Sequence, residues 1–207
     1  MESNGWPEYT KRSWGFNRNF FVSNLLETLN EASLSDALEV LEPLVERSAW
    51  VAERATRQRP FASDQDVAQT LVNVILETEF PKRVELFRAH PELAGREAST
   101  GTMTAASTSE QGRLGLLNLS AKDARRLQDL NARYAERFGH PYIVALHRVP
   151  DLEFLFETFE RRLTASSVEE HVSTLAEIAS VIYARCAKAF NGATQQHACA
   201  TREAGNV

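Results

Sequence analysis

The sequence has few of the residues that build disulfide-rich, secreted or membrane-spanning proteins. Its 207 residues include only two cysteines, Cys186 and Cys199, which are too few for a disulfide framework. Apolar runs are a few residues long, far short of the roughly 20 that cross a bilayer. The polar, acidic N-terminus has no hydrophobic region of the kind found in signal peptides. We therefore expect a cytoplasmic protein that makes no membrane contact.

Motifs for metal, nucleotide and nucleophilic chemistry are also missing from the sequence. The five histidines show no HExxH spacing and the cysteines form no CxxC, so no metal site is expected. No glycine-rich loop follows a strand, and no Gly-x-Ser-x-Gly elbow is present. The formal charge of −5 argues against a nucleic-acid-binding protein, which normally carries a basic stripe. General acid–base catalysis by a histidine and a carboxylate remains open, and it needs no cofactor.

Helical periodicity is present along almost the whole chain, whereas β-branched alternation is nearly absent. Hydrophobic residues make up 43% of the chain, which is enough to form a core. We predict an all-α, single-domain bundle of about eight helices over 19–190, with a polar extension at 1–18 and a disordered tail at 191–207. The predicted helices begin near Phe20, Ser35, Ala49, Ser63, Pro81, Ser107, Ser120, Pro150 and Ser167.

Capping signals mark several of these helix ends. Capping boxes are predicted at Ser107–Glu110 and at Ser167–Glu170. The last helix is expected to bury one stripe, which consists of Val172, Leu175, Ile178 and Ile182. Residues 92–106 are rich in Gly, Ala, Ser and Thr and are predicted to form one long loop. A loop of that length inside a compact domain is usually functional.

His90 is the first candidate for acid–base chemistry. It lies where a predicted helix stops at Pro91, directly before the long loop, and the proline disfavours helical backbone at His90. A ring in that place is held by rigid backbone and can face a cavity. The structural alternative is a histidine that interacts with the helix dipole, and position alone favours this alternative.

Glu110 is the second candidate, and it has an equally ordinary explanation. As the last residue of the predicted capping box, Glu110 would bond back to Ser107. The functional interpretation uses the same place, because N–H groups at a helix start can bind a carbonyl or carboxylate of a ligand. Neither residue establishes a site by itself.

Several sequence blocks follow one another over roughly 29–190. They are Leu29-Asn30, Ser48-Ala49-Trp50, Arg59-Pro60-Phe61, His90-Pro91-Glu92-Leu93-Ala94-Gly95, Ser107-x-x-Glu110-Gln111, Asn131-x-x-Tyr134-x-x-x-Phe138-Gly139-x-Pro141, Arg161-Arg162-Leu163, and Glu177-Ile178-Ala179 with Arg185. Any one block is weak, but the ordered set is specific. In this order the blocks resemble those of the 2-oxo-4-hydroxy-4-carboxy-5-ureidoimidazoline (OHCU) decarboxylase family.

The resemblance implies a cofactor-free, usually homodimeric, all-helical lyase that converts its ureidoimidazoline substrate into (S)-allantoin and carbon dioxide during urate breakdown. It implies that His90 is the proton donor and that Glu110 is the carboxylate paired with it. We expect Glu110 to keep the imidazole oriented and protonated, and Arg185 to offset the charge of the substrate. The implied substrate-binding residues are Pro91, Ser107, Thr108, Ser109, Gln111, Tyr142, Ile143, Val144, Ala145, Leu146 and Arg185.

Two positions depart from the family pattern. Position 140 is His where the family usually has Phe, and position 49 is Ala where Pro is usual. His140 is therefore a competing candidate for catalysis, although the family pattern favours His90. The alternatives left open are a non-catalytic helical interaction module on the same fold, and another cofactor-free lyase or hydrolase with an altered pocket.

Overall fold

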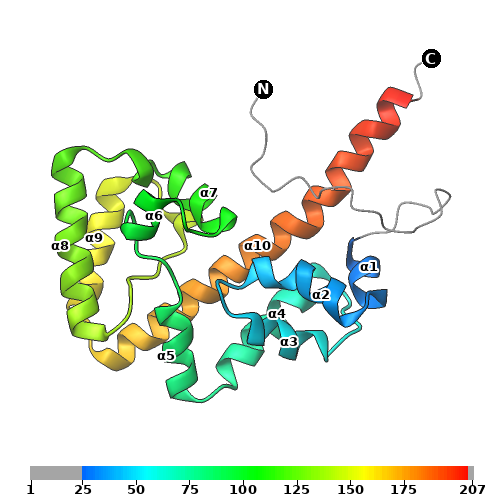
Figure 1. Ribbon diagram of the computed structural model, residues 1–207, viewed down its shortest axis with the longest axis horizontal. Coiled ribbons are helices and arrows are strands. Elements are labelled where there is room, and N and C mark those ends of the chain that lie inside the picture. Colours follow the sequence, from blue (N-terminus) through cyan, green and yellow to red (C-terminus); the bar gives the residue numbers. More distant parts are fainter. Residues whose placement is uncertain (1–24, 205–207) are drawn as a thin grey trace. The chain divides into compact units, whose positions relative to one another are not determined.

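The computed structural model describes the backbone of residues 25–204 and the side chains of residues 25–190 (Figure 1). Within that part of the chain there are ten α-helices, three short 3-10 helices and no β-strand, so the all-α prediction is confirmed. The described residues divide into two compact units, one at Thr78–Val181 and the other at 25–77 with 182–204. The extension at 1–18 lies outside the described residues.

The second of these units contains the N-terminal helices. They are α1 (Leu25–Glu31), α2 (Leu34–Leu41), η1 (Glu42–Leu44), α3 (Ala49–Thr56) and α4 (Asp64–Leu76). Helix α3 packs against both α2 and α4. The predicted start at Ser63 is confirmed, because its side chain accepts a hydrogen bond from the Asp66 N–H at the N-cap of α4. Helix α10 (Ser167–Ala204) contributes its later residues to this unit.

The Thr78–Val181 unit contains all candidate site residues except Arg185. Its elements are α5 (Phe80–Arg88), α6 (Arg96–Thr100), α7 (Ala105–Arg113), η2 (Leu116–Asn118), α8 (Ala121–Phe138), η3 (Leu146–Arg148), α9 (Leu152–Leu163) and the first part of α10. Helices α8 and α9 lie side by side (Figure 1). Gly139 ends α8 in the left-handed conformation with φ of 74°, as its place before Pro141 predicts.

Aromatic side chains form the centre of this unit. The Tyr142 ring stacks on Phe159 at 3.8 Å between centroids and meets Tyr134 edge-on at 5.3 Å. Tyr134, Tyr142 and Phe159 are each at most 1% exposed. Because these rings come from α8, α9 and the segment between them, their packing fixes that segment against both helices.

Four local predictions are wrong in detail. The predicted loop 92–106 contains α6, and α7 begins at Ala105 with Thr104 as its N-cap, so Ser107 is not the capping residue. At α10 the reciprocal capping bonds join Ser166 and Glu169, one residue before the predicted pair. Val172, predicted to be buried, is 60% exposed. Runs of adjacent Ser and Thr residues offer several equivalent caps, and tertiary packing selects among them.

The predicted tail begins at residue 191, directly after Phe190, the last residue whose side chain the structure describes. The backbone of α10 continues to Ala204, and nothing is described of side chains beyond Phe190. The disordered tail at 191–207 stays a prediction. None of the helices in the described part of the chain has the length and hydropathy that a bilayer span requires.

Candidate active site

His90 lies two residues beyond the end of α5, where the chain turns into the loop before α6. The residue is half-buried, and its backbone N–H bonds to the Phe87 carbonyl at 3.2 Å. Its ring Nδ1 lies 2.9 Å from the Leu86 carbonyl oxygen, which can only accept, so Nδ1 carries a proton and donates. A second proton, when the ring is charged, then resides on Nε2. This is the arrangement that a fixed proton donor requires.

Two amide side chains hold the loop that follows His90. The Ala94 N–H donates to Gln111 Oε1 at 2.8 Å, and Gln111 Nε2 donates to the Glu92 carbonyl at 3.3 Å. Asn131 of α8 donates to the Leu93 carbonyl at 2.9 Å. The loop after His90 is therefore pinned to α7, the helix that carries Glu110.

Glu110 is half-buried on α7, and its negative charge acts on the imidazole of His147. Burial, followed by the charge of Arg148, lowers the pKa of His147, whereas the Glu110 and Glu177 carboxylates act to raise it. Arg113, one turn after Glu110, donates to the carbonyls of Leu146 and Val149, the latter at 3.0 Å. Helix α7 thus connects the loop after His90 with the segment 142–149.

The segment 142–146 is anchored by side chains and by its own backbone. Within it, Tyr142, Ile143, Ala145 and Leu146 are buried, and Val144 is half-buried. The Ile143 carbonyl accepts from Arg162 at 2.7 Å, and the Ala145 N–H donates to Glu177 at 2.7 Å. Burial raises the pKa of Tyr142 to about 12, so its phenol stays protonated at neutral pH. The side chain of Tyr142 belongs to the core.

Residues 107–109 lie within the first turns of α7 and not before it. Ser107 is buried, and its N–H bonds to the Thr104 hydroxyl at 3.2 Å, while Thr108 and Ser109 are exposed. The helix start that was expected at Ser107 therefore belongs to Thr104 and Ala105. Contacts of Pro91 and of residues 107–109 with a substrate stay predictions.

Two residues that the sequence raised as candidates have partners of their own. Arg185 belongs to the second unit, where its guanidinium lies 3.2 Å from Glu46, and both side chains are at most 7% exposed. His140 is buried, packs edge-on against Phe87 at 5.0 Å, and bonds through Nδ1 to the Pro141 carbonyl. His140 therefore occupies the place of an aromatic core residue, which fits its alignment with a family phenylalanine.

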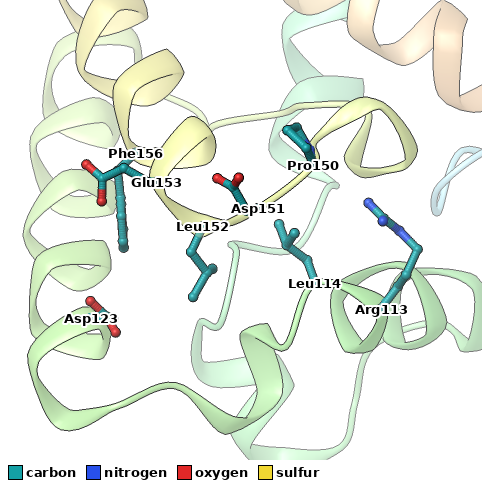
Figure 2. A pocket seen from close by; sticks show the side chains of 8 residues that line it. All are labelled: Arg113, Leu114, Asp123, Pro150, Asp151, Leu152, Glu153 and Phe156. Atoms are coloured by element: carbon teal, nitrogen blue, oxygen red, sulfur yellow. The ribbon is translucent and has the colours of Figure 1, made fainter.

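A separate pocket of about 570 Å³ opens beside Arg113. Figure 2 shows Asp151 and Glu153 near the start of α9, with Asp123 on α8 and Arg113 on α7. Neither His90 nor Glu110 lines this pocket. Among the described residues no group of three or more His, Cys, Asp or Glu side chains is placed to hold a metal ion. The charged residues that line this pocket are one arginine and three carboxylates, and they do not form the histidine–carboxylate pair expected of the active site.

Sequence reasoning missed four side chains that hold the backbone around the site: Arg113, Asn131, Arg162 and Glu177. Three of them were visible as members of family-like blocks, but no local rule assigns them a role. Each bonds to a backbone group between 19 and 38 residues away in the chain. Such pairings depend on the tertiary fold.

Comparisons with known proteins bear on the family of this chain. The family model described as OHCU decarboxylase matches residues 30–187. The mouse 2-oxo-4-hydroxy-4-carboxy-5-ureidoimidazoline decarboxylase is 32% identical over 76% of this chain and 88% of its own length. The protein of that name from Haloferax volcanii is 31% identical over 80% of this chain and 96% of its own. A crystal structure of OHCU decarboxylase in the presence of (S)-allantoin shares the fold, with a TM-score of 0.59 at 19% identity over 74% of this chain and 98% of that one. The chain therefore belongs to the OHCU decarboxylase family.

Proposed function

We propose that this protein decarboxylates 2-oxo-4-hydroxy-4-carboxy-5-ureidoimidazoline to (S)-allantoin and carbon dioxide in urate breakdown, without a cofactor. The observation that carries the proposal is the placement of His90. Its ring is oriented by the Leu86 carbonyl, and the loop after it is pinned through Gln111 to the helix of Glu110. The family match supplies the substrate class, since mouse and archaeal relatives carry that name.

The reaction needs only a positioned acid. When the bond between the ring carbon and its carboxylate breaks, carbon dioxide leaves and the electron pair is delocalised into the unsaturated ring of the substrate. Protonation of that carbon on one face then gives one enantiomer. We assign this proton to Nε2 of His90, because Nδ1 is engaged with Leu86.

Glu110 is proposed as the carboxylate that works with His90. A negative charge close to an imidazole favours its protonated form, and the same carboxylate can accept a hydrogen bond from the substrate hydroxyl. The proposed substrate contacts within the Thr78–Val181 unit are Pro91, the residues 107–109 with Gln111, and the backbone of 142–146. Gln111 is 2% exposed and bonds to the loop at both ends of its amide, which makes it a support for His90 as well.

The test of this function generates the substrate in place from urate, using urate oxidase and hydroxyisourate hydrolase. Optical rotation then follows the product. We expect fast formation of (S)-allantoin with the wild-type chain and slow, racemic allantoin in the control without it. A wild-type trace that matches this control would refute the proposal and favour a binding module or another substrate.

The His90→Asn variant tests the proton donor. Asparagine keeps a donor for the Leu86 carbonyl but cannot deliver a proton. We therefore expect a fold unchanged by circular dichroism and a loss of about 10²- to 10⁴-fold in kcat, the usual contribution of a general acid. A well-folded variant with wild-type turnover would remove His90 from this role.

We also propose that the protein is a homodimer in the cytoplasm. Family resemblance supports the dimer, and the thiol of Cys186, which is unpaired and buried, suits a reducing compartment. Light scattering coupled to size-exclusion chromatography distinguishes a dimer of about twice the 23.2 kDa chain mass from a monomer.

A further inference from the structure

Two charged side chains flank Val144 in the middle of the segment 142–146. Arg162 of α9 donates to the carbonyl of the preceding residue, Ile143, at 2.7 Å. Glu177 of α10 accepts from the N–H of the following residue, Ala145, also at 2.7 Å. The two peptide groups that contain the backbone atoms of Val144 are thus each held by one charged partner.

Peptide geometry determines what these two bonds do to Val144. In a trans peptide the C=O and N–H point in opposite directions within one plane, and the described cis bond lies elsewhere in the chain. The Ile143 carbonyl points at Arg162, so the Val144 N–H points away from Arg162. The Ala145 N–H points at Glu177, so the Val144 carbonyl points away from Glu177. Within residues 25–190 Val144 makes no backbone hydrogen bond of its own.

We propose that Arg162 and Glu177 are positioning residues, which orient the N–H and C=O of Val144 as a donor and acceptor for the N–H and C=O groups of the ureide substrate. This inference rests on the proposed function, because it gives that function its substrate-orienting device. The two bonds are charge-assisted, and such bonds are shorter and stronger than neutral ones. Backbone dipoles held in advance of binding need no reorganisation when the substrate arrives.

The surroundings of Arg162 support a fixed rather than an adaptable role. Its side chain is 8% exposed and forms an ion pair with Glu170, whose side chain is 1% exposed. Glu170 also accepts from the Tyr134 hydroxyl, and Arg162 bonds to Thr174 at 3.1 Å. The guanidinium carbon lies 4.7 Å above the Tyr142 ring. Glu170, Thr174 and the Tyr142 ring therefore hold the guanidinium in place. The bond from Arg162 in turn restricts the direction of the Ile143 carbonyl.

Glu177 gives the sharper test, because its side chain reaches solvent and can be changed without leaving a buried charge. Its other partner is Arg148 at 2.6 Å. The Glu177→Ala variant removes the acceptor of Ala145, and we expect KM to rise about tenfold or more while kcat changes much less. Glu177→Gln keeps an acceptor oxygen, so it should restore most of the affinity.

Two controls separate orientation from stability. Arg148→Ala breaks the ion pair but leaves the bond from Ala145 to Glu177, and its KM should equal that of the wild type. Glu160→Ala removes a comparable pair with Arg126, 3.0 Å away, outside the segment. If Glu177→Ala keeps the wild-type KM while the wild type forms (S)-allantoin, the positioning role is refuted and the proposed function stands. A KM that rises equally in Arg148→Ala also refutes it.

Arg162→Lys provides the matching test on the other side of Val144. A lysine keeps the charge opposite Glu170, but its single ammonium cannot reproduce the planar fork that reaches both Glu170 and the Ile143 carbonyl. We expect KM to rise, and binding of (S)-allantoin to weaken by a similar factor in calorimetry, with the folded circular dichroism spectrum retained. If this variant does not fold, the Glu177 series alone decides the inference. A folded Arg162→Lys protein with unchanged KM and allantoin affinity contradicts it.

Discussion

At the scale of single residues, the loop after His90 depends on one unusual backbone conformation, at Ala94, and on one close approach, at Gly95. Ala94 has a φ of 47°, in the left-handed region that residues with a Cβ rarely adopt. A Cβ added to the next residue, Gly95, would lie 2.6 Å from the Cβ of Glu92. The bonds from Gln111 and Asn131 hold the loop in this conformation in spite of its cost. The loop is therefore rigid where a proton donor needs rigid support.

Gly95→Ala tests this rigidity. The added methyl cannot be accommodated without a backbone shift, because its nearest neighbour is the Cβ of Glu92 at 2.6 Å, an atom that moves only with its backbone. We expect a loss of about 1–3 kcal/mol in the free energy of unfolding. We also expect a fall of about 10- to 100-fold in kcat/KM, since a small displacement of catalytic groups is costly. Urea unfolding and the coupled allantoin assay measure the two effects.

The neighbouring change Ala94→Gly serves as the control. It relieves about 1–2 kcal/mol of left-handed strain and loses about 0.5–1 kcal/mol to the greater freedom of glycine in the unfolded chain. Stability should therefore stay close to that of the wild type, and activity should persist. Equal losses of stability and activity in Gly95→Ala and Ala94→Gly would contradict the clash with Glu92 as the cause, because Ala94→Gly introduces no clash.

At the scale of elements, the start of α7 decides where Glu110 is placed. The hydroxyl of Thr104 accepts from the Ser107 N–H, and its carbonyl accepts from the Thr108 N–H at 2.9 Å. Three of the four residues after Ala106 are Ser or Thr, so the helix had several candidate starts in the sequence. With the start at Ala105, Glu110 lies in the second turn of α7 and not at a cap. Glu110 therefore does not stand at the position of a capping-box residue.

Thr104→Ala is expected to destabilise the protein by about 1 kcal/mol, the usual value of an N-cap side chain. Ser109→Ala, an exposed change inside the same helix, should be neutral or slightly stabilising, because alanine has the higher helix propensity. Thermal unfolding of both variants against the wild type measures the difference. A larger loss in Ser109→Ala than in Thr104→Ala would place the cap elsewhere.

Secondary structure could largely be predicted from the sequence, because caps such as Ser63 and Ser120 and stops such as Gly139 are local signals. The site could be predicted only in outline. His90 and Glu110 are candidates because of the order of family-like blocks, and their roles stay predictions. The bond from Asn131 to the Leu93 carbonyl spans 38 residues and leaves no periodic signal in the sequence. Bonds of this kind depend on tertiary packing, and rules based on local residue spacing cannot predict them.

At the scale of the whole molecule, stability and catalysis place opposite demands on histidine. His140 lies among Phe87, Tyr134 and Phe138, and burial lowers its pKa below the ordinary value. The Pro141 carbonyl and the Glu170 carboxylate act in the opposite direction, while Arg162 and Arg88 lower the pKa further. A catalytic acid must take up a proton near neutral pH, so the surroundings of His140 suit a neutral core ring.

The sign of the resulting pH dependence follows from linkage. The unfolded chain protonates this imidazole near pH 6.5, whereas the folded protein resists its protonation until a lower pH. As the pH falls through this window, the unfolded state binds more protons than the folded state, and the stability contributed by His140 is lost. His140→Phe removes that contribution and keeps an aromatic ring in the same place. We therefore expect the free energy of unfolding of the variant to fall less steeply below about pH 6.5.

The same variant separates the two histidines that compete for the catalytic role. If His90 is the proton donor, His140→Phe keeps (S)-allantoin formation at neutral pH, while His90→Asn loses it. Loss of turnover in a stably folded His140→Phe protein would transfer the role of the acid to His140. If the free energy of unfolding falls equally with pH below neutrality in the wild type and in His140→Phe, burial does not lower the pKa of His140. That result would contradict the environment described for this ring.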